Sequence, residues 1–374
     1  MKSQKELVEA KKSVTRDIRF DILKTLGIFS IILAHIIPQN IFFNIRNFDV
    51  SLMVIVSGSL FYCSSYKKNY SLLTYLHKRI PRLIAPVWLF LSFYFISISV
   101  AFYLLGKDYP FLLKKHIINS FLLLDGIGYV WVIRVFILMA IISSIIMNLY
   151  KSCRSKKHFF AVLLFIYICY EIVLQIATKI NLVNIPFLSS LINNYVFYAI
   201  PYGCLFGLGI TLPTMKRKSI LVVAGVFLTV FLIVAGYLSY TQGVIPSTQS
   251  FKYPPRLYYL SYGIFMSMLT FSVVDILCKK YNLNNQENPI FKAIVFISTS
   301  TLWIYLWHIL FLYFKQSLVQ IEPDIATNYI IFFLVITILS VTATYIQKTS
   351  ISTLIQNTKF GQDNSEMLAI LFLK

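Results

Sequence analysis

Long apolar runs separated by short polar connections dominate this chain. About 20 consecutive apolar residues are needed for a helix to cross the hydrocarbon core of a bilayer. Ten runs fit that description, although the second is short and carries Asp49. They lie at roughly 18–37, 48–63, 83–105, 129–149, 159–177, 193–212, 219–240, 256–277, 293–314 and 329–347. The pattern predicts an all-α, polytopic integral membrane protein with about ten transmembrane helices.

The polar segments between the runs predict an orientation. If the N-terminus is cytoplasmic, the inner segments hold 24 Lys and Arg residues and the outer segments hold 8. Cytoplasmic loops of membrane proteins carry such an excess of basic residues. We therefore expect cytoplasmic termini, with a basic leader at 1–17, one membrane domain at 18–347 and a tail at 348–374.

The amino-acid composition excludes several classes of protein. The AVILMFWYC set makes up 58% of the chain and charged residues only 13%, against about 25% in soluble domains. Mean hydropathy is +0.73. A soluble globule, a fibrous protein and a disordered chain are excluded. The net charge of +20 belongs to the inner loops, so we expect no nucleic-acid partner. The five cysteines form no CxxC pair, so we expect neither a disulfide framework nor a metal site.

Ionisable groups within or at the edge of the spans are the first functional candidates. A charged group at membrane depth costs a few kcal/mol even on lenient scales, so such groups are rare unless they have a role. The candidates are Asp21, Lys24, His35, Asp49, Arg134, Glu171 and His308, with Arg256 at an outer edge.

The first span places two of these candidates on one helix face. Lys24 and His35 are eleven residues apart, which returns to within about 20° of the same face and separates them by about 16 Å. Asp21 lies one turn before Lys24 and can pair with it. The stripe suits an anionic ligand near the inner end and proton chemistry near the outer end. Alternatively, Lys24 extends to the headgroups and His35 lies in the outer interface.

A basic stretch precedes the third span. Arg79 and Arg82 lie three residues apart, and we expect them on the first helical turn, where Pro81 is tolerated. Two guanidinium groups and free backbone N–H groups at a helix start suit a phosphate or pyrophosphate. The alternative is a plain cytoplasmic anchor.

The remaining candidates share the outer half of the predicted bundle. Asp49 begins the second span, Trp131 and Arg134 begin the fourth, and Arg256 precedes the eighth. Glu171 and His308 lie at similar depth. Such groups are tolerated around a wet pocket, although some can be paired for structure, Arg134 with Glu171 for example. Ser57-Gly58 in the second span is explained by close helix packing.

Four segments together resemble acyltransferase family 3, bacterial membrane proteins that O-acylate surface glycans and related acceptors. FDILKTLGIFSIILAH is similar to the family's first helix, and LMVIVSGSLF to its second. KRIPRLIAPVW is similar to the R-x-x-R-x-x-P start of its third helix, and TLWIYLWHILF to a late helix with Tyr305 and His308. Lys24 stands where arginine is commoner, Thr25 interrupts the usual basic-glycine pair, and Ser59 replaces an aromatic residue.

The resemblance implies an O-acetyltransferase that uses cytoplasmic acetyl-CoA as donor substrate and holds no bound cofactor. It implies that Arg79, Arg82 and Lys24 hold the donor's phosphates, and that His35 acts as general base or carries the acyl group. The supporting or acceptor-binding residues are then expected to be Asp21, Asp49, Trp131, Arg134, Glu171, Arg256, Tyr305 and His308.

The expected partners are acyl-CoA, a polysaccharide or lipid-linked glycan acceptor, the lipid bilayer and other envelope-biosynthesis proteins. The expected location is the cytoplasmic (inner) membrane of a bacterium. Two other functions remain open at this point. A proton-coupled transporter or exporter of a lipid-linked sugar or small solute would use the same His, Asp and Glu as a proton relay. A structural member of an envelope-synthesis complex would need none of them.

Overall fold

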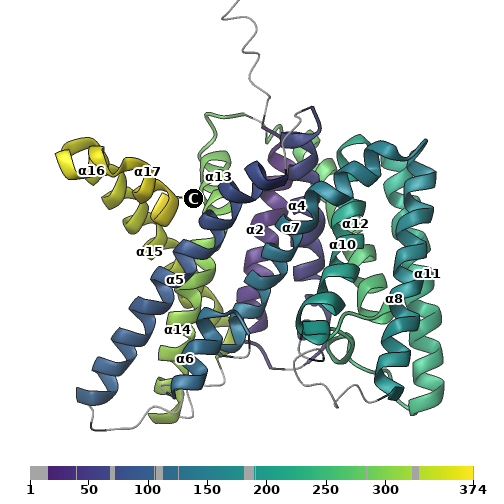
Figure 1. Ribbon diagram of the computed structural model, residues 1–374, viewed down its shortest axis with the longest axis horizontal. Helices are drawn as coiled ribbons and strands as arrows, with labels where there is room; N and C mark the ends of the chain where they lie inside the picture. The colour runs from purple at the N-terminus through teal and green to yellow at the C-terminus, as the bar shows by residue number, and fades with distance from the viewer. Residues whose placement is uncertain are drawn as a thin grey trace, which may run out of the picture.

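The computed structural model describes most of the chain as helix (Figure 1). Within the described residues there is no β-strand. The structure describes residues 16–38, 40–67, 72–104, 106, 113–124, 126–180, 189, 191–283, 285–321 and 328–373. All but the last two residues of the predicted leader, 1–17, therefore lie outside the described residues.

Each predicted apolar run coincides with a helix. In chain order these are α2 (Ile18–Ala34), α4 (Asp49–Ser65), α5 (Leu72–Leu104), α7 (Trp131–Ser152), α8 (Lys156–Ile180), α10 (Phe197–Thr211), α11 (Arg217–Gln242), α12 (Leu257–Lys280), α13 (Pro289–Thr299) with α14 (Thr301–Ile321), and α15 (Tyr329–Asn357). Eight helices in the described residues are long and apolar enough to cross a membrane, and the α13–α14 pair makes nine. Helix α2 has 17 residues and is slightly shorter than the 18 residues that these helices have at least. The all-α, multi-pass membrane fold is confirmed.

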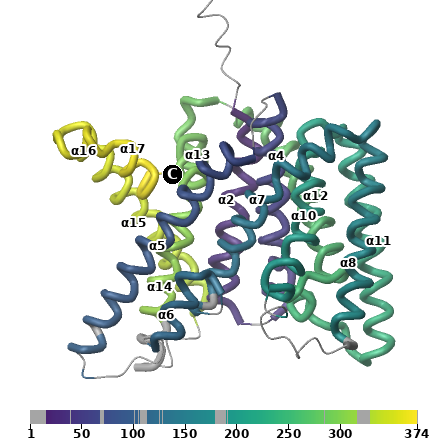
Figure 2. The backbone as a smooth tube through the Cα atoms, viewed as in Figure 1, coloured from purple at the N-terminus to yellow at the C-terminus, as the bar shows by residue number. Residues whose placement is uncertain are grey.

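The helices surround a buried centre formed by α4, α10 and α12. Most residues of these three helices are buried, whereas α8, α11 and α15 are mostly exposed and carry many exposed Leu, Ile, Val and Tyr side chains. Figure 2 shows α8 and α11 at one edge of the molecule and α5, α14 and α15 at the other. An apolar exterior of this kind suits contact with lipid.

Two glycines permit the central contact between α4 and α10. A Cβ atom on Gly58 would lie 2.1 Å from the Phe206 carbonyl oxygen, and one on Gly209 would lie 2.1 Å from the Ile55 carbonyl oxygen. Ser59 Oγ also donates to the Gly209 carbonyl oxygen at 2.8 Å. The predicted role in close helix packing is confirmed for Gly58.

The ninth span is broken. We predicted a single run over 293–314, but α13 and α14 meet at an angle of 74° around Ser300. A break inside a membrane helix frees carbonyl groups that need other partners. Helix α2 supplies some of these partners, as described below.

The C-terminal segment folds back onto the bundle. After α15 the chain forms the short helices α16 (Lys359–Asp363), α17 (Ser365–Leu368) and η8 (Ala369–Leu373). Trp303 Nε1 donates to the Leu371 carbonyl oxygen at 3.1 Å, and the Trp303 and Phe372 rings stack. The apolar end of the sequence thus packs on α5, α14 and α15.

Candidate active site

Two histidines from different spans meet at one end of the bundle. His35 ends α2, and His308 lies on α14 with none of its surface exposed. His35 Nδ1 and His308 Nε2 are 3.1 Å apart, and the two rings stack with an interplanar angle of 16°. The contact joins residues 273 positions apart in the sequence. A direct hydrogen bond between the imidazoles follows.

The surroundings of His308 define which nitrogen atoms carry hydrogen. His308 Nδ1 bonds the carbonyl oxygen of Tyr305, which can only accept, so Nδ1 of His308 is the donor. In a neutral imidazole the other nitrogen is then an acceptor. His308 Nε2 must therefore accept from His35 Nδ1, which leaves Nε2 of a neutral His35 with a free lone pair. That atom has the electronic state of a general base or nucleophile.

Two tyrosines hold the histidine pair. The hydroxyl of Tyr305, on α14, donates to the carbonyl oxygen of Tyr129 in the short helix η2 (Gly128–Val130). The Tyr129 ring meets the His35 ring edge-on, with 4.5 Å between their centroids. Tyr305, which we expected in a supporting position, thus ties the histidine-bearing helix to the start of α7.

A cavity of about 100 Å³ lies beside His35. Its lining brings together three of the predicted site residues, His35, Asp49 and Trp131, from α2, α4 and α7. The other lining residues are Ile31, Ala34, Phe43, Arg46, Val50, Val132, Gln249, Lys252 and Tyr253. A small cavity thus brings together three of the predicted site residues at one end of the bundle.

Two cations in this cavity were missed from the sequence. Arg46 Nη1 and Lys252 Nζ bind the two carboxylate oxygens of Asp49 at 2.8 Å and 3.2 Å, and all three residues are buried. Lys252 Nζ also donates to Asn47 Oδ1 at 3.2 Å. Burial lowers the pKa of Lys252, and the carboxylate of Asp49 opposes that shift. Arg46 and Lys252 fall in predicted outer connections, where a charge normally needs no partner.

The remaining outer candidates lie elsewhere. Arg134 donates to the Leu123 carbonyl oxygen and to Asn194 Oδ1, each at 3.3 Å, and lies near the rings of Tyr195 and Tyr198. Glu171, which we considered as a partner of Arg134, has hydrogen bonds to other groups. Glu171 Oε1 accepts from the Tyr167 hydroxyl and, at 2.8 Å, from the Leu257 backbone N–H. It therefore satisfies the first turn of α12, which Arg256 precedes as the N-cap residue.

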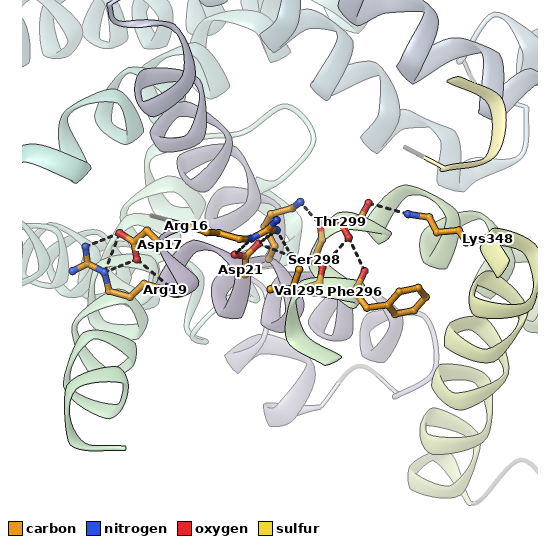
Figure 3. A network of polar contacts seen from close by, with 10 residues as sticks. Arg16, Asp17, Arg19, Asp21, Val295, Phe296, Ser298, Thr299 and Lys348 are labelled. Carbon is orange, nitrogen blue, oxygen red and sulfur yellow. Dashed lines mark hydrogen bonds and ion pairs between the residues drawn. The ribbon is translucent and has the colours of Figure 1, made fainter. Parts of the chain in front are cut away.

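The N-terminal half of α2 is bound to the broken span (Figure 3). Asp21 accepts from Arg16 Nη2 at 2.6 Å and from Ser298 Oγ at 2.5 Å. Lys24 Nζ donates to the carbonyl oxygen of Ser298, at the C-terminal end of α13. Asp21 thus forms an ion pair with Arg16, and Lys24 donates to a carbonyl group that the break exposes.

Arg79 and Arg82 are not at a helix start. Helix α5 begins at Leu72, so both residues, and Pro81 between them, lie inside it. Our expectation of free backbone N–H groups at this position is wrong, because α5 begins at Leu72, well before its apolar run. Arg79 is exposed and Arg82 partly exposed, so their guanidinium groups can contact a ligand without those N–H groups.

The family comparison is decisive at this point. A model of the acyltransferase domain, family 3, matches residues 17–346. This chain belongs to acyltransferase family 3. No curated protein and no solved structure matches the chain.

As a family 3 acyltransferase, the protein has its matched region running from the start of α2 into α15. That region contains the His35–His308 pair and the Arg79–Arg82 stretch. It also contains the ion-paired residues Arg46, Asp49 and Lys252, called here the Asp49 cluster. The acyltransferase therefore carries an imidazole with an available lone pair beside a small polar cavity. This is the arrangement that proton removal from a hydroxyl group requires.

Proposed function

We propose that this acyltransferase moves an acetyl group from cytoplasmic acetyl-CoA to a hydroxyl group of a cell-surface polysaccharide or its lipid-linked precursor, in the cytoplasmic membrane of a bacterium. The observation that carries the proposal is the hydrogen-bonded His35–His308 pair next to a cavity. A sugar hydroxyl is a poor nucleophile at neutral pH, and a neutral imidazole with a free nitrogen is suited to take its proton.

The donor side of the proposal rests on the basic inner end. Arg79 and Arg82 bind the phosphates of the CoA moiety, for which guanidinium groups are well suited. Lys24 can join them by exchanging the Ser298 carbonyl oxygen for a phosphate oxygen. The eleven residues from Lys24 to His35 span about 16 Å of helix, comparable to the length of the pantetheine arm. The thioester then lies near His35.

The transfer step conserves atoms and charge. The acceptor O–H proton moves to His35 Nε2 while the oxygen attacks the thioester carbonyl carbon. The C–S bond then breaks, and the CoA thiolate takes the proton from the imidazolium. In the alternative route His35 Nε2 attacks the thioester carbonyl carbon first, and the C–S bond breaks to release the CoA thiolate. The acceptor oxygen then attacks the acyl carbon of the acyl-histidine, the C–N bond breaks, and the acceptor proton passes to the thiolate. In both routes His308 holds His35 in the required tautomer.

Three variants in a strain lacking the native copy test the proposal. The base-labile O-acetyl content of purified surface polysaccharide is measured by NMR at equal membrane protein levels. Wild type should restore acetylation, and His35→Ala should lower it at least 10²-fold, because a positioned base contributes about 10²–10⁴. Arg82→Ala should also lower it, whereas Arg154→Ala, at an exposed cation between α7 and α8, should not.

Two results would contradict the proposal. Equal acetylation in wild type and His35→Ala would show that His35 does not carry the chemistry. An absence of acetyl groups with wild type, together with changed glycan export that collapses with the proton gradient, would favour the transporter.

A further inference from the structure

The cavity beside His35 contains more positive than negative charge. Arg46, Asp49 and Lys252 are only 6%, 2% and 3% exposed, and the two cations share the single carboxylate. Isolated buried charge is costly, so an excess cation in such a place is normally balanced by an anion. The site thus has one positive charge available for a ligand.

One donor in the cluster is unused. Arg46 lines the cavity, and among the described residues its Nε atom is buried without any hydrogen-bond partner. Its Nη1 atom is occupied by Asp49. A buried guanidinium N–H without an acceptor loses its hydration, and no protein hydrogen bond compensates for that loss. The Nε–H group is therefore available to an acceptor atom placed in the cavity.

Aromatic and aliphatic side chains form much of the remaining wall. Trp131 and Tyr253 both line the cavity and pack edge-on, with 5.0 Å between their ring centroids. Lys252 Nζ lies 5.7 Å from the Trp131 ring centroid. Apolar and aromatic walls with a few placed polar groups are typical of small-ligand sites. The face of a sugar ring can pack on such a wall while its substituents reach the cations.

We propose that this cavity is the acceptor subsite and that it selects a sugar carrying an anionic group, a carboxylate or a phosphate, near the hydroxyl to be acylated. The inference rests on the proposed function and adds the class of acceptor. The anion accepts from Arg46 Nε and Lys252 Nζ, and the neighbouring hydroxyl faces His35. The cavity lies at the opposite end of α2 from Lys24, so it is separate from the donor phosphates.

The test compares neutral and anionic sugars, with inorganic phosphate as the anion without a sugar. The purified full-length protein in detergent is incubated with methyl glucuronoside, methyl glucoside, glucose 6-phosphate or inorganic phosphate. Binding is measured as the shift in Tm, and acetyl transfer from acetyl-CoA is measured separately. We expect the anionic sugars, but neither methyl glucoside nor inorganic phosphate, to raise Tm. The relative effects of glucuronoside and sugar phosphate identify the anion.

Arg46→Lys is the informative variant, because it can keep an ion pair with Asp49 while it removes the Nε donor. It should weaken binding of the anionic sugars by about 10- to 100-fold, which corresponds to the usual free energy of a charged hydrogen bond. Acetyl transfer to methyl glucoside should stay unchanged. Arg154→Lys, at an exposed position, is the matched control and should behave as wild type.

The outcomes separate this inference from the proposed function. Equal binding of neutral and anionic sugars, no binding of either, or an equal shift with inorganic phosphate would overturn the inference. So would an Arg46→Lys variant that slows transfer equally to both sugars, which would place Arg46 at the transition state. Selective binding of the anionic sugar without acetyl transfer would support the subsite and count against the acetyltransferase.

Discussion

At the scale of single residues, the His35–His308 bond decides what the site can do. A lone histidine at the end of a helix can carry its hydrogen on either ring nitrogen. Here the Tyr305 carbonyl oxygen orients His308, and His308 orients His35. Hydrogen-bond partners of this kind set the tautomer and hold the ring in place. We therefore infer that His308 positions His35.

His308→Phe and His308→Gln test this role. Phe fills the space without an acceptor, so it should lower acetyl transfer about 10²-fold, the low end of what a positioned base contributes. Gln can offer an amide oxygen to His35 Nδ1 and should retain more activity. The rate of acetyl transfer and its pH profile are measured for both variants at equal folded-protein levels. Equal losses in Phe and Gln would mean that the acceptor atom of residue 308 is unimportant.

The residues of the site were only partly visible in the sequence. His35, Asp49, Trp131 and His308 could be assigned a common depth, because depth follows from position along a span. Their contacts could not, because helix order around a bundle is set by packing between distant segments. Arg46 was missed because a basic residue in a loop normally remains in water, and nothing local shows that Phe43 and Asp49 bury it.

At the scale of helices, α2 stabilises the break in the ninth span. The Ser298 carbonyl oxygen accepts from Lys24, and the Thr299 carbonyl oxygen accepts from Lys348 at 3.4 Å. Cations near a helix C-terminus also interact favourably with its dipole. Because His35 is on α2 and His308 follows the break, this contact helps to set the distance between the two histidines.

Lys24→Met should therefore destabilise the protein by about 1–3 kcal/mol, the worth of a hydrogen bond to a charged group. Lys348→Met removes a longer bond at a more exposed position and should cost less. Both are measured by thermal unfolding in detergent, with the acetyl-CoA KM determined in parallel. A raised KM with unchanged stability in Lys24→Met would instead make Lys24 a ligand of the donor.

The α4–α10 contact offers a cleaner test of packing. Gly58→Ala forces a methyl group against the backbone of Phe206 and should cost about 1–3 kcal/mol, as overpacking usually does. Gly225→Ala on α11 meets nothing within 4 Å and is the matched control. The free energies of unfolding of the two variants, measured by thermal unfolding, should differ by that amount. A Gly58→Ala variant as stable as the control would show that α4 and α10 can move apart without a loss of stability.

The helix boundaries show where sequence patterns stop being informative. Each predicted run coincides with a described helix, yet hydropathy placed the start of α5 too late, because the basic stretch His77–Arg79 interrupts its apolar residues. It also missed the α13–α14 break. The sequence there, SerThrSerThr over 298–301, contains neither Pro nor Gly. The carbonyl groups at the break have partners from α2 and α15, and contacts between distant segments of this kind leave no local signal.

At the scale of the whole molecule, the two ends of the bundle have different chemistry. Exposed cations such as Arg79, Arg154 and Lys157 belong to the segments predicted to be cytoplasmic. The histidine pair and the Asp49 cluster lie at the other end of α2 and α4. This division suits a reaction that takes its donor from one side of the membrane and its acceptor from the other.

The orientation itself is open to direct measurement. In a variant with the five native cysteines replaced by serine, Tyr240→Cys and Lys157→Cys each introduce one exposed thiol, at the end of α11 and the start of α8. The excess of inner basic residues predicts that a membrane-impermeant maleimide labels residue 240 in intact protoplasts and residue 157 only after permeabilisation. The reverse pattern would place the histidine pair on the cytoplasmic side, and both substrates would then have to reach it from there.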